Sequence, residues 1–146
     1  MNNVEKAVSL FMNGFRCSQA ILSTYGTQFG LKPEIALKLA SPFGAGMGSL
    51  GNTCGAITGA YMVLGLKFGN TRASEIKKKE KAYEVVKEFV KRFKSRNDTI
   101  FCRELLNCDI STPEGRNKAI EEKLFIELCP KFVQDSAEIL EEILQQ

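Results

Sequence analysis

The chain of 146 residues contains no histidine, and this absence removes several kinds of functional site. Histidine is the usual general base near neutral pH, and it completes Ser-His-Asp and Cys-His catalytic groups and many zinc sites. Acidic pairs do not replace it, because the neighbours in Glu121-Glu122 and in Glu141-Glu142 would point in different directions on a helix. The sequence therefore argues against an acid–base enzyme.

Long apolar runs and export signals are missing as well. The longest apolar run, residues 56–66, is well short of the ~18–20 residues that a membrane span needs. The N-terminus has neither a basic segment nor a long apolar segment, so no export signal is visible. The net charge is only +3, and no basic tract is interleaved with aromatic residues. We expect a cytoplasmic protein that binds neither nucleic acid nor membranes.

What is present is a helical pattern along most of the chain, with apolar residues three and four positions apart and no strand-like alternation. Helices are predicted at residues 4–12, 17–29, 33–40, 54–68, 72–96, 101–106, 113–124 and 130–144. In the longest of these, the residues expected to face the core are Ile76, Tyr83, Val86, Val90 and Phe93. The prediction is a single all-α domain over residues 1–146, folded as a compact multi-helix bundle.

A glycine-rich segment, residues 44–55, leads into the helix predicted at 54–68. Small residues four apart in that helix, Gly55 with Gly59 and Ala56 with Ala60, predict a buried central helix in close contact with its neighbours. Residues 46–51 match G-x-G-x-x-G, but no strand precedes them, so a dinucleotide site is not expected. The glycines could let the backbone approach a bound group closely. The candidate cofactor-binding residues are Gly44, Gly46, Gly48, Gly51 and Gly55.

Five cysteines are the strongest chemical signal in the sequence. Four of them, Cys17, Cys54, Cys102 and Cys129, fall at or near predicted helix starts. The free N–H groups and the positive end of the dipole at a helix start favour a thiolate or another anion. We predict that the four converge on one site, with Cys54 in the first turn of its helix as the central contact. Cys108 is expected to be peripheral or to act as a resolving thiol.

These residues resemble the C_GCAxxG_C_C family of redox-active proteins. The core motif reads Cys54-Gly55-Ala56-Ile57-Thr58-Gly59, and Cys17, Cys102 and Cys129 match the other three cysteines of the pattern. Cys108 lies outside the pattern, and Asn107 stands where the family is expected to have glycine. The resemblance implies a redox function and a bound iron–sulfur cluster or other prosthetic group.

Three functions remain open at the level of sequence. In the first, Cys17, Cys54, Cys102 and Cys129 bind a metal centre, most plausibly an iron–sulfur cluster, for electron transfer. In the second, the protein has no cofactor and exchanges thiols and disulfides, with Cys54 as the attacking thiolate. In the third, it is a non-catalytic module that binds zinc or a small molecule. The spacing lacks the paired C-x-x-C of zinc ribbons and bacterial ferredoxins. The redox partner is not identified, and dimerisation through an apolar helix face is an open alternative to a monomer.

Overall fold

The computed structural model describes residues 1–146 and is built from helices alone, which confirms the all-α class and the compact bundle. The α-helices are α1 (Asn3–Met12), α2 (Cys17–Gly26), α3 (Pro33–Ala40), α4 (Gly55–Phe68), α5 (Ile76–Asn97), α6 (Cys102–Leu105), α7 (Pro113–Glu121) and α8 (Leu124–Leu144). Two short 3-10 helices, η1 (Thr27–Phe29) and η2 (Ser41–Phe43), extend α2 and α3. None of these helices is both long enough and apolar enough to cross a membrane.

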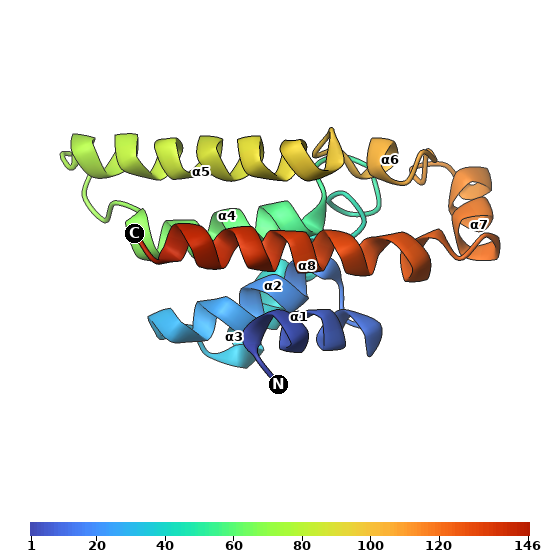
Figure 1. The fold of residues 1–146 in the computed structure, drawn as a ribbon, viewed down its shortest axis with the longest axis horizontal. Helices are drawn as coiled ribbons and strands as arrows, with labels where there is room; N and C mark the ends of the chain where they lie inside the picture. The colour runs from blue at the N-terminus through green and yellow to red at the C-terminus, as the bar shows by residue number, and fades with distance from the viewer.

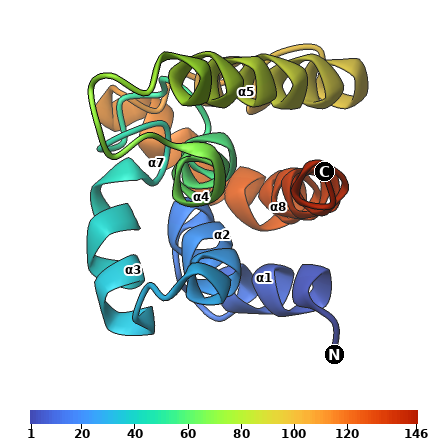
Figure 2. The same ribbon diagram turned by 90° about the vertical axis from the view of Figure 1, so that its left-hand side faces the viewer.

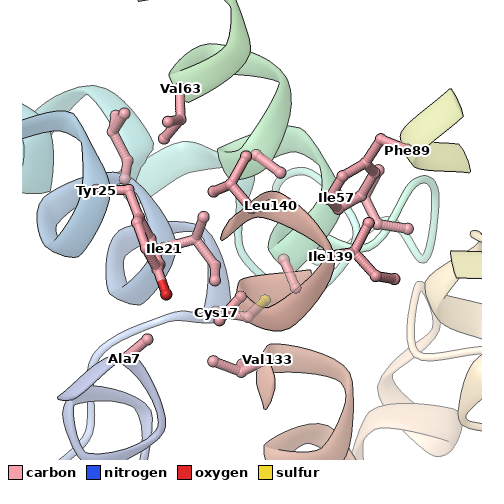
Figure 3. Close-up of a cluster of buried hydrophobic side chains, with 14 of the residues drawn as sticks. Ala7, Cys17, Ile21, Tyr25, Ile57, Val63, Phe89, Val133, Ile139 and Leu140 are labelled. Carbon is pink, nitrogen blue, oxygen red and sulfur yellow. The ribbon is translucent and has the colours of Figure 1, made fainter. Parts of the chain in front are cut away.

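The helices form three layers, with α4 and α8 in the middle layer (Figure 1). Helix α5 covers one side of this layer, and α1, α2 and α3 cover the other (Figure 2). Figure 3 shows Cys17 at the same core as apolar side chains of α2, α4 and α8, such as Ile21, Ile57 and Leu140. The first cysteine of the candidate site is therefore part of the main core and not a surface residue.

Helix α4 is the buried central helix that the small-residue pattern predicts. A Cβ atom added to Gly59 would lie 2.9 Å from the backbone oxygen of Ser18, so α2 and α4 cross in direct backbone contact. On the opposite side, the Ser136 hydroxyl of α8 donates a 2.7 Å hydrogen bond to the backbone oxygen of Ala56. Gly69 follows the last residue of α4, as expected. Both neighbours therefore hold the start of α4 at a fixed position beside the cysteines.

The start and the inner face of the longest helix differ from the prediction. Helix α5 begins at Ile76 because residues 71–75 form a turn, in which the Glu75 carboxylate accepts hydrogen bonds from the N–H groups of Thr71 and Arg72. Ile76 and Tyr83, which were expected in the core, are 56% and 71% exposed. The residues that α5 buries are Val85, Phe89 and Phe93. Their four-residue spacing is also typical of the buried face of a helix. The sequence of α5 therefore contains two overlapping apolar stripes, and packing against the other helices determines which of them is buried.

The chain around Cys129 also departs from the prediction. Helix α7 ends at Glu121, Lys123 adopts a left-handed conformation with φ 58°, and α8 begins at Leu124. Cys129 and Pro130 therefore lie in the second turn of α8, and Pro130 is not its first residue. Proline inside a helix leaves one carbonyl without its N–H partner. The earlier start is favoured because Leu124 packs against the small core cluster under α6 and α7.

Candidate functional site

Four of the five cysteines line a single cavity of about 350 Å³. They are Cys17, Cys54, Cys102 and Cys129, the four that the sequence places in one site. Cys108 does not line the cavity, and its thiol instead donates a hydrogen bond of 3.2 Å to the backbone oxygen of Gly115. The structure therefore brings the four sulfurs from α2, α4, α6 and α8 to one place, although they are far apart in sequence.

A short antiparallel bridge between Thr53 and Phe101 sets Cys54 beside Cys102. The Cys54 N–H donates to the Ile100 oxygen at 2.8 Å, and the Cys102 N–H donates to the Asn52 oxygen at 2.7 Å. Cys102 is the first residue of α6, and Phe101 stands at its N-cap position.

Cys54 lies just before α4 and not in its first turn, where it was expected. It is the N-cap residue, and no side chain caps this helix start. The side-chain oxygen of Asn52, which could cap this helix from its place in the sequence, instead accepts a 2.9 Å hydrogen bond from the Arg103 guanidinium. Thr53, a second possible cap, is held in the bridge to Phe101. Tertiary contacts therefore keep both residues from capping α4.

Gly55 makes room for the sulfur of Cys17 against the start of α4. A Cβ atom at position 55 would lie 2.5 Å from Cys17 Sγ, which is closer than a side chain can tolerate. It would also lie 3.0 Å from the backbone oxygen of Phe43. This contact explains why glycine follows Cys54 in the sequence. Cys54 supplies one sulfur to the site, and Gly55 leaves space for the sulfur of Cys17.

The pKa of Cys17 is lowered from 9.0 to about 7, chiefly by its hydrogen bond with the Cys54 side chain. Backbone N–H groups of Ala45, Ser18 and Ala56 lower it further, while burial acts in the opposite direction. Cys17 is the first residue of α2, and Ala56 is in the first turn of α4, so two helix starts act on this sulfur. Of the four thiols in the cavity, Cys17 is therefore the one whose pKa is lowered.

The pKa of Cys54 is raised, which is opposite to the direction expected for an attacking thiolate at this position. Its hydrogen bond with Cys17 is the largest cause, followed by burial and by the negative charge on Cys17. Two thiols in contact share one negative charge, and the member with more N–H donors holds it. Cys54 is therefore the proton donor of the pair.

Cys102 and Cys129 are protonated thiols in the same cavity. Burial, followed by the charge on Cys17, raises the pKa of Cys102 to about 12. The pKa of Cys129 is also raised, chiefly by burial and then by the charge on Cys17. No three of the cysteine, aspartate and glutamate side chains are arranged to hold a single metal ion. The geometry thus separates a close Cys17–Cys54 pair from two further thiols.

The glycine-rich segment makes a left-handed turn beside this pair. Residues 45–49 all have positive φ, between 51° and 72°, although three of the five are not glycine. Such residues cost roughly 1–2 kcal/mol each in this conformation. The turn is tied down by Arg116, which donates a 2.7 Å hydrogen bond to the Ser49 hydroxyl, and by Arg103, which donates to the Gly51 oxygen at 3.2 Å. In this conformation the Ala45 N–H points to Cys17.

Of the five glycines predicted to contact a cofactor, only Gly55 lines the cavity. Gly44 packs against the Arg16 side chain, and Gly46 lies against the backbone of residues 51–52. Gly51 lies against Arg103, and nothing crowds Gly48. These four glycines shape the turn, while the cofactor role predicted for them stays a prediction.

The remaining walls of the cavity are mostly apolar and were missed at the level of sequence. They come from α1, the α1–α2 connection, α6 and the first turns of α8, and include Phe11, Phe15, Phe125, Ile126 and Phe132. Arg16 is the single charged residue among them. Phe15 and Arg16 directly precede Cys17 in the sequence, and this is the one signal that could have placed them in the site.

Comparisons with known proteins place the chain in a family. Residues 15–143, which include all five cysteines, match the family described as "Putative redox-active protein (C_GCAxxG_C_C)". No curated protein and no solved structure matches the chain. The match agrees with the four cysteines that the fold gathers around one cavity. The chain belongs to the C_GCAxxG_C_C family.

Proposed function

We propose that this protein is a thiol–disulfide redox protein in which Cys17 and Cys54 alternate between two thiols and one internal disulfide. The observation that carries the proposal is the hydrogen-bonded contact of the two side chains, with the negative charge held on Cys17. Thiolate is the attacking species in disulfide exchange, and an attacking thiol works best when its pKa is near the ambient pH. Cys17 meets that requirement near neutral pH.

The exchange uses the two sulfurs in order. The Cys17 thiolate attacks one sulfur of a substrate disulfide, a Cys17–substrate bond forms, and the other substrate sulfur leaves as a thiolate that takes a proton. Cys54 then loses its proton and attacks Cys17 Sγ, which breaks the mixed disulfide and releases the second substrate thiol. The substrate gains two electrons and two protons. The two cysteines supply both electrons and the Cys54 proton, and water supplies the second proton because Cys17 reacts as a thiolate. A dithiol partner of the same class of chemistry must reduce the protein again.

The raised pKa of Cys54 does not block the second step. Two of the causes that raise it, the shared hydrogen bond and the charge, come from the Cys17 thiolate. That charge disappears once Cys17 is in a mixed disulfide, so Cys54 becomes easier to deprotonate at the moment when it must attack. The pair therefore protects Cys54 as a thiol until Cys17 has reacted.

Trapping the intermediate tests this order. The Cys54→Ser variant should accumulate a mixed disulfide on Cys17 after exposure to a small disulfide, while the Cys17→Ser variant should form none at position 54. Mass spectrometry of peptides identifies the linked residues. Cys108→Ser is the matched control, because Cys108 lies outside the cavity, and it should still form the Cys17–Cys54 disulfide. Failure of the unaltered protein to form that disulfide would reject the proposal.

A second candidate is an iron–sulfur protein, favoured by the meeting of all four thiols in one cavity with apolar walls. The donor set fits such a cluster, which four cysteine thiolates commonly hold. Cys17, Cys54, Cys102 and Cys129 would be the ligands, and the cluster would supply one-electron transfer. The N–H groups of Ala45 and Ala56 that bond Cys17 would then tune the potential.

Metal analysis separates the two candidates. Protein purified without oxygen should contain iron and sulfide and absorb visible light if the cluster candidate is correct. A colourless, iron-free protein after anaerobic reconstitution would remove it. Zinc is less well supported, because a zinc site needs four ligands around one ion and no three side chains have that arrangement.

A further inference from the structure

The cavity is larger than the redox step requires. Cys17 and Cys54 occupy one part of it, and the rest of the roughly 350 Å³ is enclosed by apolar side chains. Binding sites for small molecules commonly start at about 300 Å³ and are mostly apolar with a few polar groups. Near the start of α8, Ile126 is 61% exposed, and Phe15 and Met12 on the α1 side are 37% and 54% exposed. Apolar side chains thus extend from the sulfurs to the solvent.

Four phenylalanine rings are part of this apolar surface. Phe11 and Phe15 contribute from one side, and Phe125 and Phe132 from α8. Aromatic side chains bind flat rings through stacked and edge-to-face contacts, which add about 0.5–1.5 kcal/mol per pair to the effect of burial. The shape and chemistry of the surface therefore favour a ring-containing ligand over an aliphatic one.

Arg16 gives the cavity a charge preference. It is the single charged residue that lines the cavity, and no acidic residue accompanies it. The cations that form ion pairs are Lys78, Lys81, Arg92, Arg96 and Lys131, all on α5 or α8. The stem of Arg16 packs against Gly44, where an added Cβ would lie 2.7 Å from Arg16 Cγ. This packing fixes the stem of Arg16 at the cavity, next in sequence to Cys17, and its guanidinium forms no ion pair.

We propose that the substrates of the Cys17–Cys54 pair are small aromatic disulfides that carry an acidic group. The ring contacts Phe11, Phe15 and Phe125, the acidic group pairs with Arg16, and the disulfide lies against Cys17. Arginine binds carboxylates and related anions through two parallel hydrogen bonds, so it also fixes the orientation of the ligand. This inference rests on the proposed thiol–disulfide function and adds the class of substrate.

Reaction rates with three disulfides test the inference. The probes are 5,5′-dithiobis(2-nitrobenzoate), which is aromatic and anionic, 2,2′-dithiodipyridine, which is aromatic and neutral, and hydroxyethyl disulfide, which is aliphatic and neutral. Each rate at Cys17 is divided by the rate of the same probe with free glutathione, because leaving groups differ. We expect the normalised rates to fall in the order given, by about tenfold at each step, the size of one charge-assisted or aromatic contact.

Two variants separate charge from shape. Arg16→Gln should slow the anionic probe about tenfold more than it slows either neutral probe, while Arg72→Gln, an exposed cation outside the cavity, should change none of the three. Ile126→Glu should slow both aromatic probes, the anionic one most. Equal normalised rates for all three probes would overturn the substrate inference, even if the Cys17–Cys54 disulfide forms.

A redox-inert probe distinguishes failure of the inference from failure of the proposed function. Anilinonaphthalene sulfonate combines aromatic rings with an anionic group and contains no disulfide. Its fluorescence should rise on binding to the unaltered protein, and Arg16→Gln should weaken the binding about tenfold. Binding that depends on Arg16, without any exchange at Cys17, would support the ligand class and reject the redox role. Binding that is insensitive to Arg16→Gln would overturn the charge preference.

Discussion

Replacement of Gly55 by alanine tests the contact on which the candidate site depends. The new Cβ would lie 2.5 Å from Cys17 Sγ, 3.0 Å from the Phe43 oxygen and 3.1 Å from the Ser18 nitrogen. Two of these three atoms are backbone and cannot move alone. Such overpacking costs about 1–3 kcal/mol, and alanine returns about 0.5–1 kcal/mol through its helix propensity. We expect a net loss of stability of about 1–2 kcal/mol.

The same replacement should change the chemistry of Cys17. The easiest response is for the Cys17 sulfur to move away, which weakens its hydrogen bonds with Cys54 and with the N–H of Ala56. Since these bonds lower the pKa of Cys17 to about 7, that pKa should move back toward 9.0. Less thiolate would then be present at pH 7, and alkylation of Cys17 by iodoacetamide should slow at that pH.

The assay combines urea unfolding with the pH dependence of Cys17 alkylation, followed by peptide mass spectrometry. Gly65→Ala is the matched control, because Gly65 lies in the same helix and an added Cβ meets nothing within 4 Å. The control should leave Cys17 unchanged and raise stability by about 0.5–1 kcal/mol. If Gly55→Ala behaves like Gly65→Ala in both measurements, the steric account of the Cys-Gly pair is refuted.

Three further outcomes follow from the packing and the pKa shifts. Alkylation of Cys17 should reach half its maximum rate near pH 7, whereas Cys102, with a pKa raised to about 12, should stay unreactive at pH 8; equal rates at the two residues would contradict the assignment. Unfolding in urea should show stability rising between about pH 7 and pH 8, because the unfolded state keeps the Cys17 proton that the folded state has lost; closer to pH 9 the raised pKa values of Cys54, Cys102 and Cys129 act in the opposite direction, so a fall between pH 7 and pH 8 is the result that would contradict the assignment. Gly59→Ala should destabilise the protein by about 1–3 kcal/mol, since its Cβ would lie 2.9 Å from the Ser18 oxygen, and circular dichroism during thermal unfolding measures the loss against Gly65→Ala.

The helical class and most helix ends could be predicted from the sequence, because the physics behind them is local. Apolar spacing, Pro33 as the first residue of α3 and glycine after α4 act within a few residues of their own positions. Local rules failed where two local solutions were close in energy. In α5 two apolar stripes overlap. Near Cys129, Pro130 suggested a helix start at residue 130, whereas α8 begins six residues earlier, at Leu124, which packs against the small core cluster.

Within the site, the sequence by itself singled out the four cysteines that line the cavity and the Cys54-Gly55 pair. Only the tertiary structure decided which thiol is activated, because the N–H donors of Ala45 and Ala56 reach Cys17 across the fold. It also decided that Arg16 and an aromatic wall share the cavity with the sulfurs. A pKa depends on neighbours in space, and a cavity depends on side chains from several helices. Neither can be read from spacing along one chain.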